Sequence, residues 1–600
     1  MRTRSRIAFL LAAALLPASS SAFLACAKVN EGPRVTGSAG NGGGGGAGGG
    51  KVDGGAGGGG PTYQPACPNN MCADFPATPI IDPGTPADAA TMFPGASSGA
   101  APCVYEPADG ALFPKGLLRP RIKWSGTTGV HRITVHADNQ SRDLVAYTNK
   151  SFWMVPKDIW AALSAHTTEK DITVTVRAAG AGESGAKFQI APVAATGSIV
   201  FWAANPAASD DREVVDRKTA TELRGFGVGD EGTAAVLKVP QVQQPSAEEN
   251  GIPRPVGCMG CHVATPDTSY IAFVDDWPWN LVVAGVKPGR TGMRLPGLTD
   301  GGLAALNMPW GGMMAFSKAV WAPGRRMVVL ASSLADYTMP WVTASSKPAK
   351  LTWYNLDAAA PAMPGMVMPG VQFGEVARQG DSRGAAAPTW SHDGATIVYC
   401  STQGGNQDGA LAKGATDLYS VPFADGAGGP AKPLPGASDP AFEEYYPAYS
   451  PDDRLIAYNR VPAGENMYAN PLSELYVLPA QGGVATRLAA NDPPACTGRK
   501  SPGVNNVWGR WSPTVASSGV KRYYWLLFSS YQSDVAMTRF RDRNHNGRPV
   551  MLSQLYLTAV VQSGDSGNIQ TYGGIYLWNQ PTDTINATPI WEDLEIPVVQ

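Results

Sequence analysis

The segments WSHDGATIVY (Trp390–Tyr399) and YSPDDRLIAY (Tyr449–Tyr458) are two copies of one pattern: an aromatic residue, a polar turn and a short apolar strand. Further copies of the turn and strand begin at Pro266 and Pro323, and a fifth begins at Pro513 with a longer turn. Successive copies start 57, 69, 59 and 62 residues apart. Because apolar runs that follow Pro, Asp and Gly are typical of strands, the pattern predicts a repeated all-β unit.

A second strand pattern follows most of the copies, in the segments Trp353–Leu356, Asp417–Tyr419, Glu474–Tyr476 and Gln554–Tyr556. A unit of this size cannot bury both faces of its own sheet, so such units stack radially as the blades of a β-propeller. Residues 197–600 have room for six blades. We expect the sixth blade to combine Ile199–Trp202 with the C-terminal segment Ile575–Trp578, because closing the ring removes exposed sheet edges.

The consensus of the copies, W-S-P-D-G-x-x-I-A-Y, resembles the PD40 repeat of the TolB-like six-bladed propellers. The resemblance covers roughly 330 residues, and the two segments quoted first are its best copies. It implies a binding platform whose open face takes protein or glycan partners. The fold by itself does not fix the function.

The composition agrees with β-structure. Gly 70 and Pro 51 among 600 residues, with 9% aromatic and 16% charged residues, argue against a coiled coil or a mainly helical chain. Lys+Arg 47 nearly balance Asp+Glu 49, so no binding to nucleic acid is expected. After the first 25 residues, no apolar run approaches the roughly 20 residues that a membrane-spanning helix needs.

The N-terminus has the features of an export signal, which we assign to residues 1–25. Three arginines precede the apolar segment Ile7–Leu16, which is too short to span a membrane. Ser20–Ala22 fits an ordinary cleavage site, whereas Phe23–Cys26 resembles the lipobox of bacterial lipoproteins, in which Cys26 carries the lipid. The lipobox implies an exported protein that is held at the bacterial outer membrane or cell surface by a lipid anchor alone.

Residues 26–105 are expected to form a tether and a Cys/Pro-rich segment. Residues 37–60 contain 16 glycines in 24 positions, a composition that behaves as a flexible coil. Cys67, Cys72 and Cys103 follow, and in an exported protein such cysteines form disulfides. Three cysteines cannot all pair with one another, so Cys496, in a Pro-rich loop, is a further candidate partner. The pairing among the four stays open.

Residues 106–196 form a separate predicted module. The segments Ile133–Ala137 and Ile172–Val176 alternate apolar and polar residues, as strands with one buried side do. A turn is expected at Lys157–Leu163. The size and strand spacing resemble an immunoglobulin or fibronectin type III sandwich. We expect the histidines of the module, His131, His136 and His166, to be surface or hydrogen-bonded residues.

The most specific chemical motif is Cys258-Met259-Gly260-Cys261-His262. C-x-x-C-H is the attachment motif of c-type haem, in which two thiolates form thioethers with the vinyl groups and the histidine binds the iron. With 8 Cys and 6 His among 600 residues, a chance occurrence is rare. We therefore expect one haem c, attached to Cys258 and Cys261 and ligated by His262.

Two other interpretations of this motif stay open. The cysteines could be a redox-active dithiol, although no thioredoxin-like pattern surrounds them. They could bind zinc, although no second C-x-x-C or H-x-x-x-H supplies further ligands. The segment CHVATPDTSYIAF (Cys261–Phe273), in which the motif runs into a propeller repeat, resembles a group of bacterial TolB-like proteins with the same arrangement.

The sixth iron ligand is not fixed by the sequence. A thioether from the blade after the motif would raise the reduction potential, and a second histidine would lower it. The candidates are Met313 and Met314, with Met308 and Met327 nearby, and His392 and His545. Adaptable core packing explains the methionines equally well. A missing sixth ligand would leave a position for a small molecule.

A calcium loop is a further candidate site. Asp542, Asn544 and Asn546 resemble the first half of a D-x-N-x-N-G loop, which binds Ca2+ through oxygen atoms. Ser553 stands where the twelfth, acidic ligand is expected, so a polar turn is the alternative.

No catalytic constellation such as G-x-S-x-G, H-E-x-x-H or a P-loop occurs in the sequence. Three functions remain. The first is electron transfer by an envelope haem protein whose redox or envelope partner is unknown. The second is a propeller that acts as a binding platform without a redox role. The third is a haem enzyme that acts on a small molecule.

Overall fold

The computed structural model describes residues 67–597, apart from residues 97, 205–220, 249–251, 276–279, 308–312, 333–348, 358–371, 404–414, 466–469, 534–535, 543–547 and 565–567. The expected signal peptide, Cys26 and the glycine-rich segment 37–60 lie outside these residues. The described part is mostly β-structure, as the repeats predict. None of its helices has the length and hydropathy that a membrane crossing requires.

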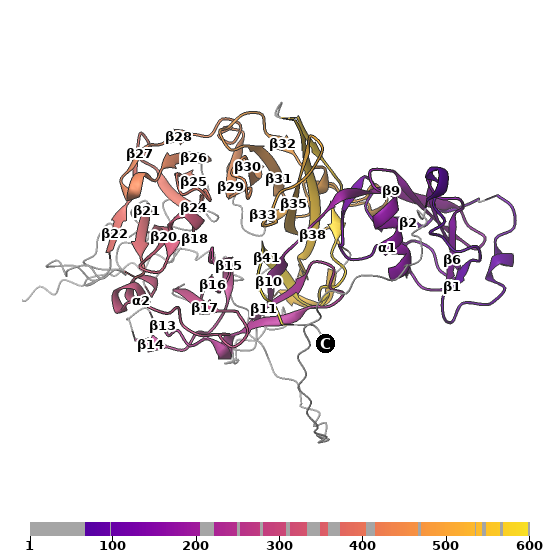
Figure 1. Ribbon diagram of the computed structural model, residues 1–600, viewed down its shortest axis with the longest axis horizontal. Helices are drawn as coiled ribbons and strands as arrows, with labels where there is room; N and C mark the ends of the chain where they lie inside the picture. Colours follow the sequence, from indigo (N-terminus) through magenta and orange to yellow (C-terminus); the bar gives the residue numbers. More distant parts are fainter. Residues whose placement is uncertain are drawn as a thin grey trace, which may run out of the picture.

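Two sheets and one helix make up the N-terminal unit (Figure 1). The larger sheet has the order β1-β6-β5-β8-β9-β3 and the smaller has the order β2-β4-β7. Their strands are β1 (Ile80–Ile81), β2 (Cys103–Glu106), β3 (Ala111–Lys115), β4 (Arg121–Ser125), β5 (His131–Ala137), β6 (Leu144–Thr148), β7 (Phe152–Met154), β8 (Ile172–Ala178) and β9 (Glu183–Ala194). The alternating segments of the sequence are β5 and β8, which pair antiparallel and bury every second side chain over most of their length.

The expected turn at Lys157–Leu163 is instead part of a helix, α1 (Lys157–His166). Ile159, Trp160 and Leu163 are buried on one side of this helix. Residues three and four positions apart share a helix face, so this spacing gives α1 an apolar stripe that packs on the sheets. The prediction of a turn was wrong because it gave no weight to that spacing.

Residues 198–592 form a β-propeller whose sheets are arranged around a centre (Figure 1). In the described residues, six main sheets follow one another. The first sheet contains β41 (Ile585–Glu592), β10 (Ser198–Ala204), β11 (Thr221–Gly227) and β12 (Ala234–Lys238), and the second contains β15 (Gly260–Ala264), β16 (Tyr270–Val274) and β17 (Leu281–Gly285). The third contains β18 (Met314–Ala315), β20 (Arg325–Ser332), β21 (Lys350–Asn355) and β22 (Gln372–Glu375), and the fourth contains β24 (Gly384–Trp390), β25 (Thr396–Thr402), β26 (Thr416–Pro422) and β28 (Lys432–Pro433). The fifth contains β29 (Phe442–Tyr449), β30 (Leu455–Pro462), β31 (Glu474–Pro479) and β32 (Thr486–Arg487), and the sixth contains β33 (Val507–Trp511), β35 (Lys521–Ser530), β38 (Gln554–Ser563) and β39 (Asn568–Thr571).

The first strands of the sheets form the innermost layer. Contacts link β15 to β41, β41 to β33, β33 to β29, β29 to β24 and β24 to β18. Neighbouring sheets therefore meet along their first strands, as the blades of a propeller do.

The ring closes through a strand that the sequence analysis did not identify. β41 pairs antiparallel with β10, so the last strand of the chain joins the first strand of the propeller region. The expected closing segment, Ile575–Trp578, lies elsewhere, because Ile575–Tyr576 forms β40 and pairs with β38. Both segments are short and apolar, and composition alone does not separate them.

Each of five first strands contains a β-bulge. The residues at these bulges have positive φ values, which non-glycine residues rarely adopt: Cys261 (34°), Ala387 (41°), Tyr446 (53°), Trp508 (59°) and Thr588 (44°). The pairing register with the second strand shifts at each of them. A bulge re-aims the side chains around it. The cysteine-histidine motif lies at one of these five equivalent places.

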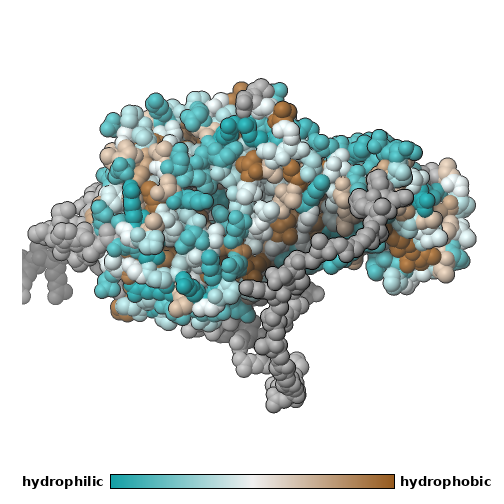
Figure 2. All heavy atoms as spheres, viewed as in Figure 1, coloured by the Kyte–Doolittle hydropathy of each residue, from teal (hydrophilic) through white to brown (hydrophobic). Residues whose placement is uncertain are grey.

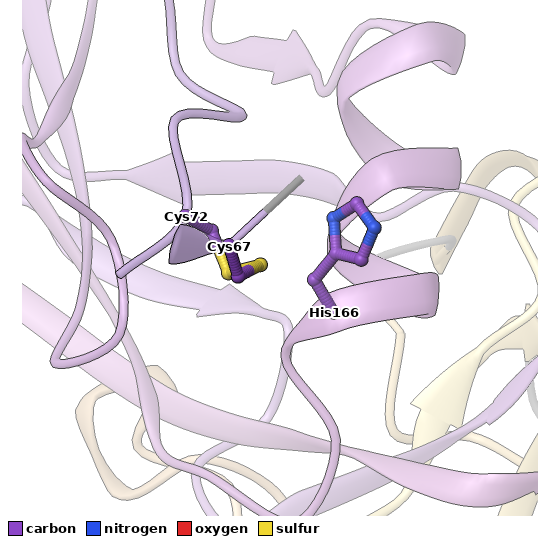
Figure 3. A group of neighbouring side chains, drawn as sticks. All are labelled: Cys67, Cys72 and His166. Atoms are coloured by element: carbon purple, nitrogen blue, oxygen red, sulfur yellow. A yellow bond between two sulfur atoms is a disulfide. The ribbon is translucent and has the colours of Figure 1, made fainter. Parts of the chain in front are cut away.

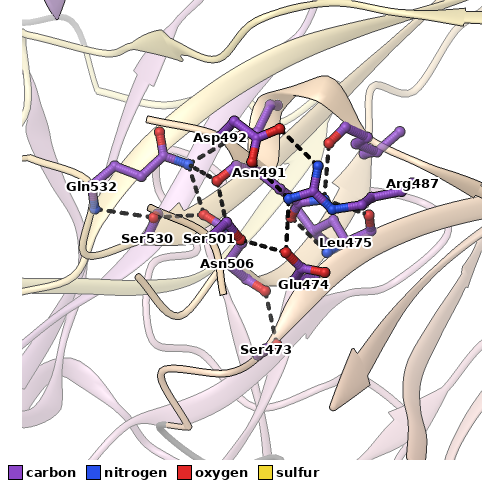
Figure 4. A network of polar contacts seen from close by, with 12 residues as sticks. Ser473, Glu474, Leu475, Arg487, Asn491, Asp492, Ser501, Asn506, Ser530 and Gln532 are labelled. Carbon is purple, nitrogen blue, oxygen red and sulfur yellow. Dashed lines mark hydrogen bonds and ion pairs between the residues drawn. The ribbon is translucent and has the colours of Figure 1, made fainter. Parts of the chain in front are cut away.

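A polar network fixes the connection between β32 and β33 (Figure 4). Asn491 exchanges two hydrogen bonds of 2.8 Å with the backbone of Leu475 in β31. Gln532 Nε2 and Ser530 Oγ both donate to Asn506 Oδ1, at 2.8 and 2.7 Å. The connection is thus tied to the sheets on both of its sides.

The N-terminal unit is joined to the propeller by a common core and a disulfide. Trp153 and Phe188 belong to the same apolar cluster as Phe201 and Trp525 of the propeller. Cys103 is bonded to Cys496, which confirms that Cys496 pairs with an N-terminal cysteine. On the face shown in Figure 2, hydrophilic residues cover most of the surface and apolar residues form small separate patches.

Replacing Cys103 and Cys496 by serine is expected to lower the free energy of unfolding by about 5 kcal/mol, because this disulfide restricts the unfolded chain over a separation of 393 residues. Urea unfolding followed by tryptophan fluorescence measures the loss. The matched control replaces Cys67 and Cys72, whose disulfide spans a separation of 5 residues and should contribute less. Equal losses in the two double variants would contradict the expectation.

Candidate functional site

The Cys258–His262 motif lies at the start of β15, which is one of the innermost strands of the propeller. Cys258 and Met259 precede β15, and Gly260, Cys261 and His262 are its first three residues. Cys258 is 0% exposed and His262 is 2% exposed. The motif is therefore buried for most of its length and is not a surface loop.

Two side chains hold the backbone of the motif. Asp275 Oδ1 accepts hydrogen bonds from the backbone N–H groups of Gly257 and Cys258, both at 2.9 Å. Its Oδ2 lies 3.0 Å from Arg254 Nη2. Burial raises the pKa of Asp275, and the charge of Arg254 opposes that rise. Thr221 Oγ1 accepts from the N–H of Met259 at 3.2 Å.

The two cysteines of the motif are in different chemical states. Cys258 is disulfide-bonded, and Cys261 is not its partner. The Thr221 hydroxyl lies 3.8 Å from Cys258 Sγ. Cys261 is half-buried at its bulge in β15.

His262 presents an imidazole nitrogen without a protein partner. Its Nδ1 lies 3.5 Å from Thr588 Oγ1 in β41, and its Nε2 is buried with no hydrogen-bond partner among the described residues. Burial lowers the pKa of His262 to about 3, with the charge of Arg510 adding to the decrease and a hydrogen bond to the backbone of Val200 opposing it. The ring is therefore neutral at ordinary pH, the form that binds metal ions.

A cation from another sheet faces the motif. Arg510, the fourth residue of β33, interacts electrostatically with both Cys261 and His262. Burial lowers the pKa of Arg510, while Cys261 and Tyr446 raise it. The motif thus receives side chains from β11, β33 and β41.

These residues offer the donor atoms that a c-type haem requires. Two cysteine sulfurs stand on one segment, and a buried, unsatisfied imidazole nitrogen follows them directly. The sulfur of Cys258 can form a thioether only after its disulfide is reduced, because attachment uses free thiols.

The structure places the other candidate ligands as follows. Met313 is half-buried against the apolar cluster that includes Met259, whereas Met314 is buried in β18 within a different cluster. Met327 is buried in β20. Met308, His545, Asn544 and Asn546 lie outside the described residues, as does the side chain of Asp542.

His392 lies in the turn after β24. Its Nδ1 is 2.7 Å from Asp453 Oδ1. Burial lowers the pKa of His392, but Asp453 and other nearby carboxylates together raise it by more, so the net shift is upward. The charge of Glu592 also acts on it. Glu592 is four residues beyond Thr588 in β41, a separation of roughly 13 Å along a strand. The structure therefore does not bring His392 to the motif.

Sequence analysis missed Asp275, Thr221, Arg510 and Thr588. Their separation from the motif along the chain gives no local signal. The structure shows one offset that the repeats share: the bulge residue precedes the aromatic or small residue of the repeat by three positions, as in Tyr446 and Tyr449 or Trp508 and Trp511. The same offset separates Thr588 from Trp591 in β41.

Comparisons with known proteins show distant structural likeness. No family model matches the chain, and no curated protein does. A putative TolB from Agrobacterium tumefaciens has 13% identity and a TM-score of 0.29, over 65% of this chain and 97% of its own. Hydrazine synthase of Kuenenia stuttgartiensis has 10% identity and a TM-score of 0.35, over 66% and 46%. At these TM-scores neither likeness carries an argument, and the propeller assignment rests on the order of the chain's own sheets.

Proposed function

We propose that this protein transfers electrons in the bacterial cell envelope through one haem c, attached to Cys258 and Cys261 and ligated by His262. The observation that carries the proposal is the buried Nε2 of His262, which has no hydrogen-bond partner among the described residues. Buried polar atoms are normally satisfied, so an exception needs an explanation, and an absent ligand is one that the motif itself offers here. The motif that contains this histidine binds iron porphyrin in other proteins.

The surrounding residues would position the group and tune it. When bound, haem supplies one-electron transfer. Asp275 and Thr221 fix the backbone of Cys258 and Met259, so the first sulfur is held in place. The nearby positive charge of Arg510 favours the form of the site that carries the additional electron.

Further features of the proposal come from the sequence. We infer that the six main sheets are the six blades of a TolB-like propeller, and that the N-terminal unit is an immunoglobulin- or fibronectin-like sandwich. A lipid on Cys26 would anchor the exported chain. Among the described candidates for the sixth iron ligand we favour Met313, because it packs on the cluster that contains Met259.

The test is expression of the whole chain together with a c-type cytochrome maturation system. We expect haem stain to persist on a denaturing gel for the wild type, and to be lost in the double variant Cys258→Ala/Cys261→Ala, because that variant can form no thioether with the porphyrin. Cys400→Ala is the matched control, since Cys400 is a buried cysteine of β25 outside the motif. A colourless wild type of the correct mass would overturn the proposal.

A binding platform is the second candidate function, and one observation favours it. Glu443 precedes the bulge residue Tyr446 by three positions, as Cys258 precedes Cys261. Glu443 Oε2 and Ser401 Oγ are buried without a hydrogen-bond partner among the described residues. Such atoms are available to a polar group of a ligand, so a colourless protein would direct attention to this end of the inner strands.

A further inference from the structure

A second group of metal-ligand residues lies in the N-terminal unit. One ligand atom each from Cys67, Cys72 and His166 lie within 4.8 Å of one another. The two sulfurs form a disulfide, and His166 is the last residue of α1. Figure 3 shows the disulfide beside the imidazole ring at the end of this helix.

Contacts other than the disulfide hold these residues in place. The backbone N–H of Cys72 donates to Asn139 O at 2.7 Å, and Ser141 N donates to Cys72 O at 2.8 Å. The backbone of Cys72 is therefore held by a pair of strand-like hydrogen bonds. A turn closed by the hydrogen bond from Met71 N to Pro68 O, at 3.1 Å, brings Cys67 back toward Cys72.

The histidine is also fixed independently of the sulfurs. Its Nδ1 lies 2.9 Å from Asp74 Oδ1, and Asp74 Oδ2 accepts a hydrogen bond from Gln140 Nε2 at 2.7 Å. Asn139 Nδ2 donates to the backbone oxygen of His166 at 3.0 Å and lies 3.5 Å from Cys72 Sγ. Opening the disulfide would leave both sulfurs beside the ring, with an N–H group directed at one of them.

We propose that reduction of the Cys67–Cys72 disulfide creates a Zn2+ site formed by the two sulfurs and the imidazole of His166. A dithiol reductant gives two electrons and two protons to the disulfide and becomes a disulfide itself, which leaves two thiols. Binding of Zn2+ then releases both thiol protons, so two thiolates neutralise the charge of the metal.

The chemistry of the three residues suits zinc. Thiolate and imidazole are preferred zinc ligands, and four residues between the two cysteines is a usual spacing. Asp74 beside the ring is the carboxylate that commonly orients a metal-binding histidine. Cys72 is 1% exposed, whereas the His166 side chain is 22% exposed, so the site is sheltered and still open to an entering ion.

The test measures alkylation of each cysteine in the reduced, folded full-length chain by peptide mass spectrometry. With one equivalent of Zn2+ instead of a chelator, alkylation of Cys67 and Cys72 is expected to slow by roughly tenfold or more, because a metal-bound thiolate is shielded from the reagent. Cys103 and Cys496 are the internal control and should react equally in both conditions. Equal rates at Cys67 and Cys72 with and without Zn2+ would overturn the proposal.

His166→Ala separates a three-residue site from chelation by the two thiols alone. We expect this variant to lose most of the protection, and the matched control His136→Ala to keep it, because His136 is an exposed histidine of β5 paired with Asp143. Protection that survives unchanged in His166→Ala would refute the role of the imidazole. If that variant does not fold, Co2+ is added instead to the reduced chain in which Cys258 and Cys261 are replaced by serine and His166 is retained. Absence of a thiolate-to-cobalt absorption band of tetrahedral intensity in that chain would refute the site.

Discussion

A chain that ends at Asp583 is expected to lose its folded propeller, because it lacks β41. This strand pairs with β10 along its length and contacts β33 and β15, so it completes one sheet and touches both neighbouring sheets. Its Trp591 is 1% exposed and donates from Nε1 to Thr196 O at 2.8 Å. Loss of one such buried tryptophan costs about 3 to 5 kcal/mol, and a whole domain is stable by only about 5 to 15 kcal/mol.

Thermal unfolding followed by circular dichroism checks this expectation. The control chain ends at Pro597, retains all of β41, and should melt like the full chain. Trp591→Ala provides a graded version, with an expected loss of about 3 to 5 kcal/mol in the free energy of unfolding. A chain ending at Asp583 that melts at the same temperature as the control would show that the ring does not depend on β41.

The repeat could be predicted from the sequence because the residues that form its pattern are adjacent in the chain. The turn residues and the strand after them stand next to one another in segments such as Trp390–Tyr399, and the structure has β24, a turn and β25 there. Ring closure could not be predicted in this way. It depends on which strand pairs with β10, and the partners Ile199 and Trp591 are almost 400 residues apart.

Burial on both faces, together with a bulge, explains why β41 was not predicted from the sequence. Strand prediction relies on strict alternation of buried and exposed residues. In β41, every residue from Ile585 to Trp591 is buried, so the strand shows no such alternation, and the positive φ of Thr588 adds a bulge within it. A bulge occurs at Cys261 as well, and the side chains around the motif come from other sheets, so the environment of the motif could not be predicted from its neighbours in sequence.

The candidate sites divide in the same way. The order of Cys258, Cys261 and His262 was visible in the sequence, whereas the positions of Thr588 and Arg510 beside them follow from the ring. His166 was expected to be a surface or hydrogen-bonded residue. It is hydrogen-bonded to Asp74, but its place next to Cys67 and Cys72 depends on the packing of α1 and on the contact of Cys72 with Asn139.

Glu444→Gln is expected to make the protein more stable than the wild type at high pH and to change little near pH 5. Glu444 lies in β29 with a fully buried side chain, and its Oε1 is 3.2 Å from Arg460 Nε. Burial raises the pKa of Glu444 from 4.5 to about 8, with Asp417 adding to the rise and Arg460 opposing it. The folded carboxyl group therefore keeps its proton at pH values where the unfolded chain has lost it.

The sign and size of the effect follow from proton linkage. A raised carboxyl pKa contributes stability that is complete below the unfolded value of 4.5 and is lost as the pH rises to about 8. A difference of 3.5 pH units corresponds to a change on the order of 4 to 5 kcal/mol. Glutamine has the shape of the protonated acid and does not titrate, so the variant lacks this loss.

Urea unfolding of both proteins at pH 5 and pH 9 measures the difference, and Glu183→Gln is the control because Glu183 is exposed in the N-terminal unit. The control should follow the wild type at both pH values. The competing force is the ion pair with Arg460, which requires an ionised Glu444. If that pair prevailed, Glu444→Gln would be less stable than the wild type at pH 9, because Arg460 would keep a buried charge without its partner. The direction of the change at pH 9 therefore decides whether burial or the arginine controls this carboxyl group.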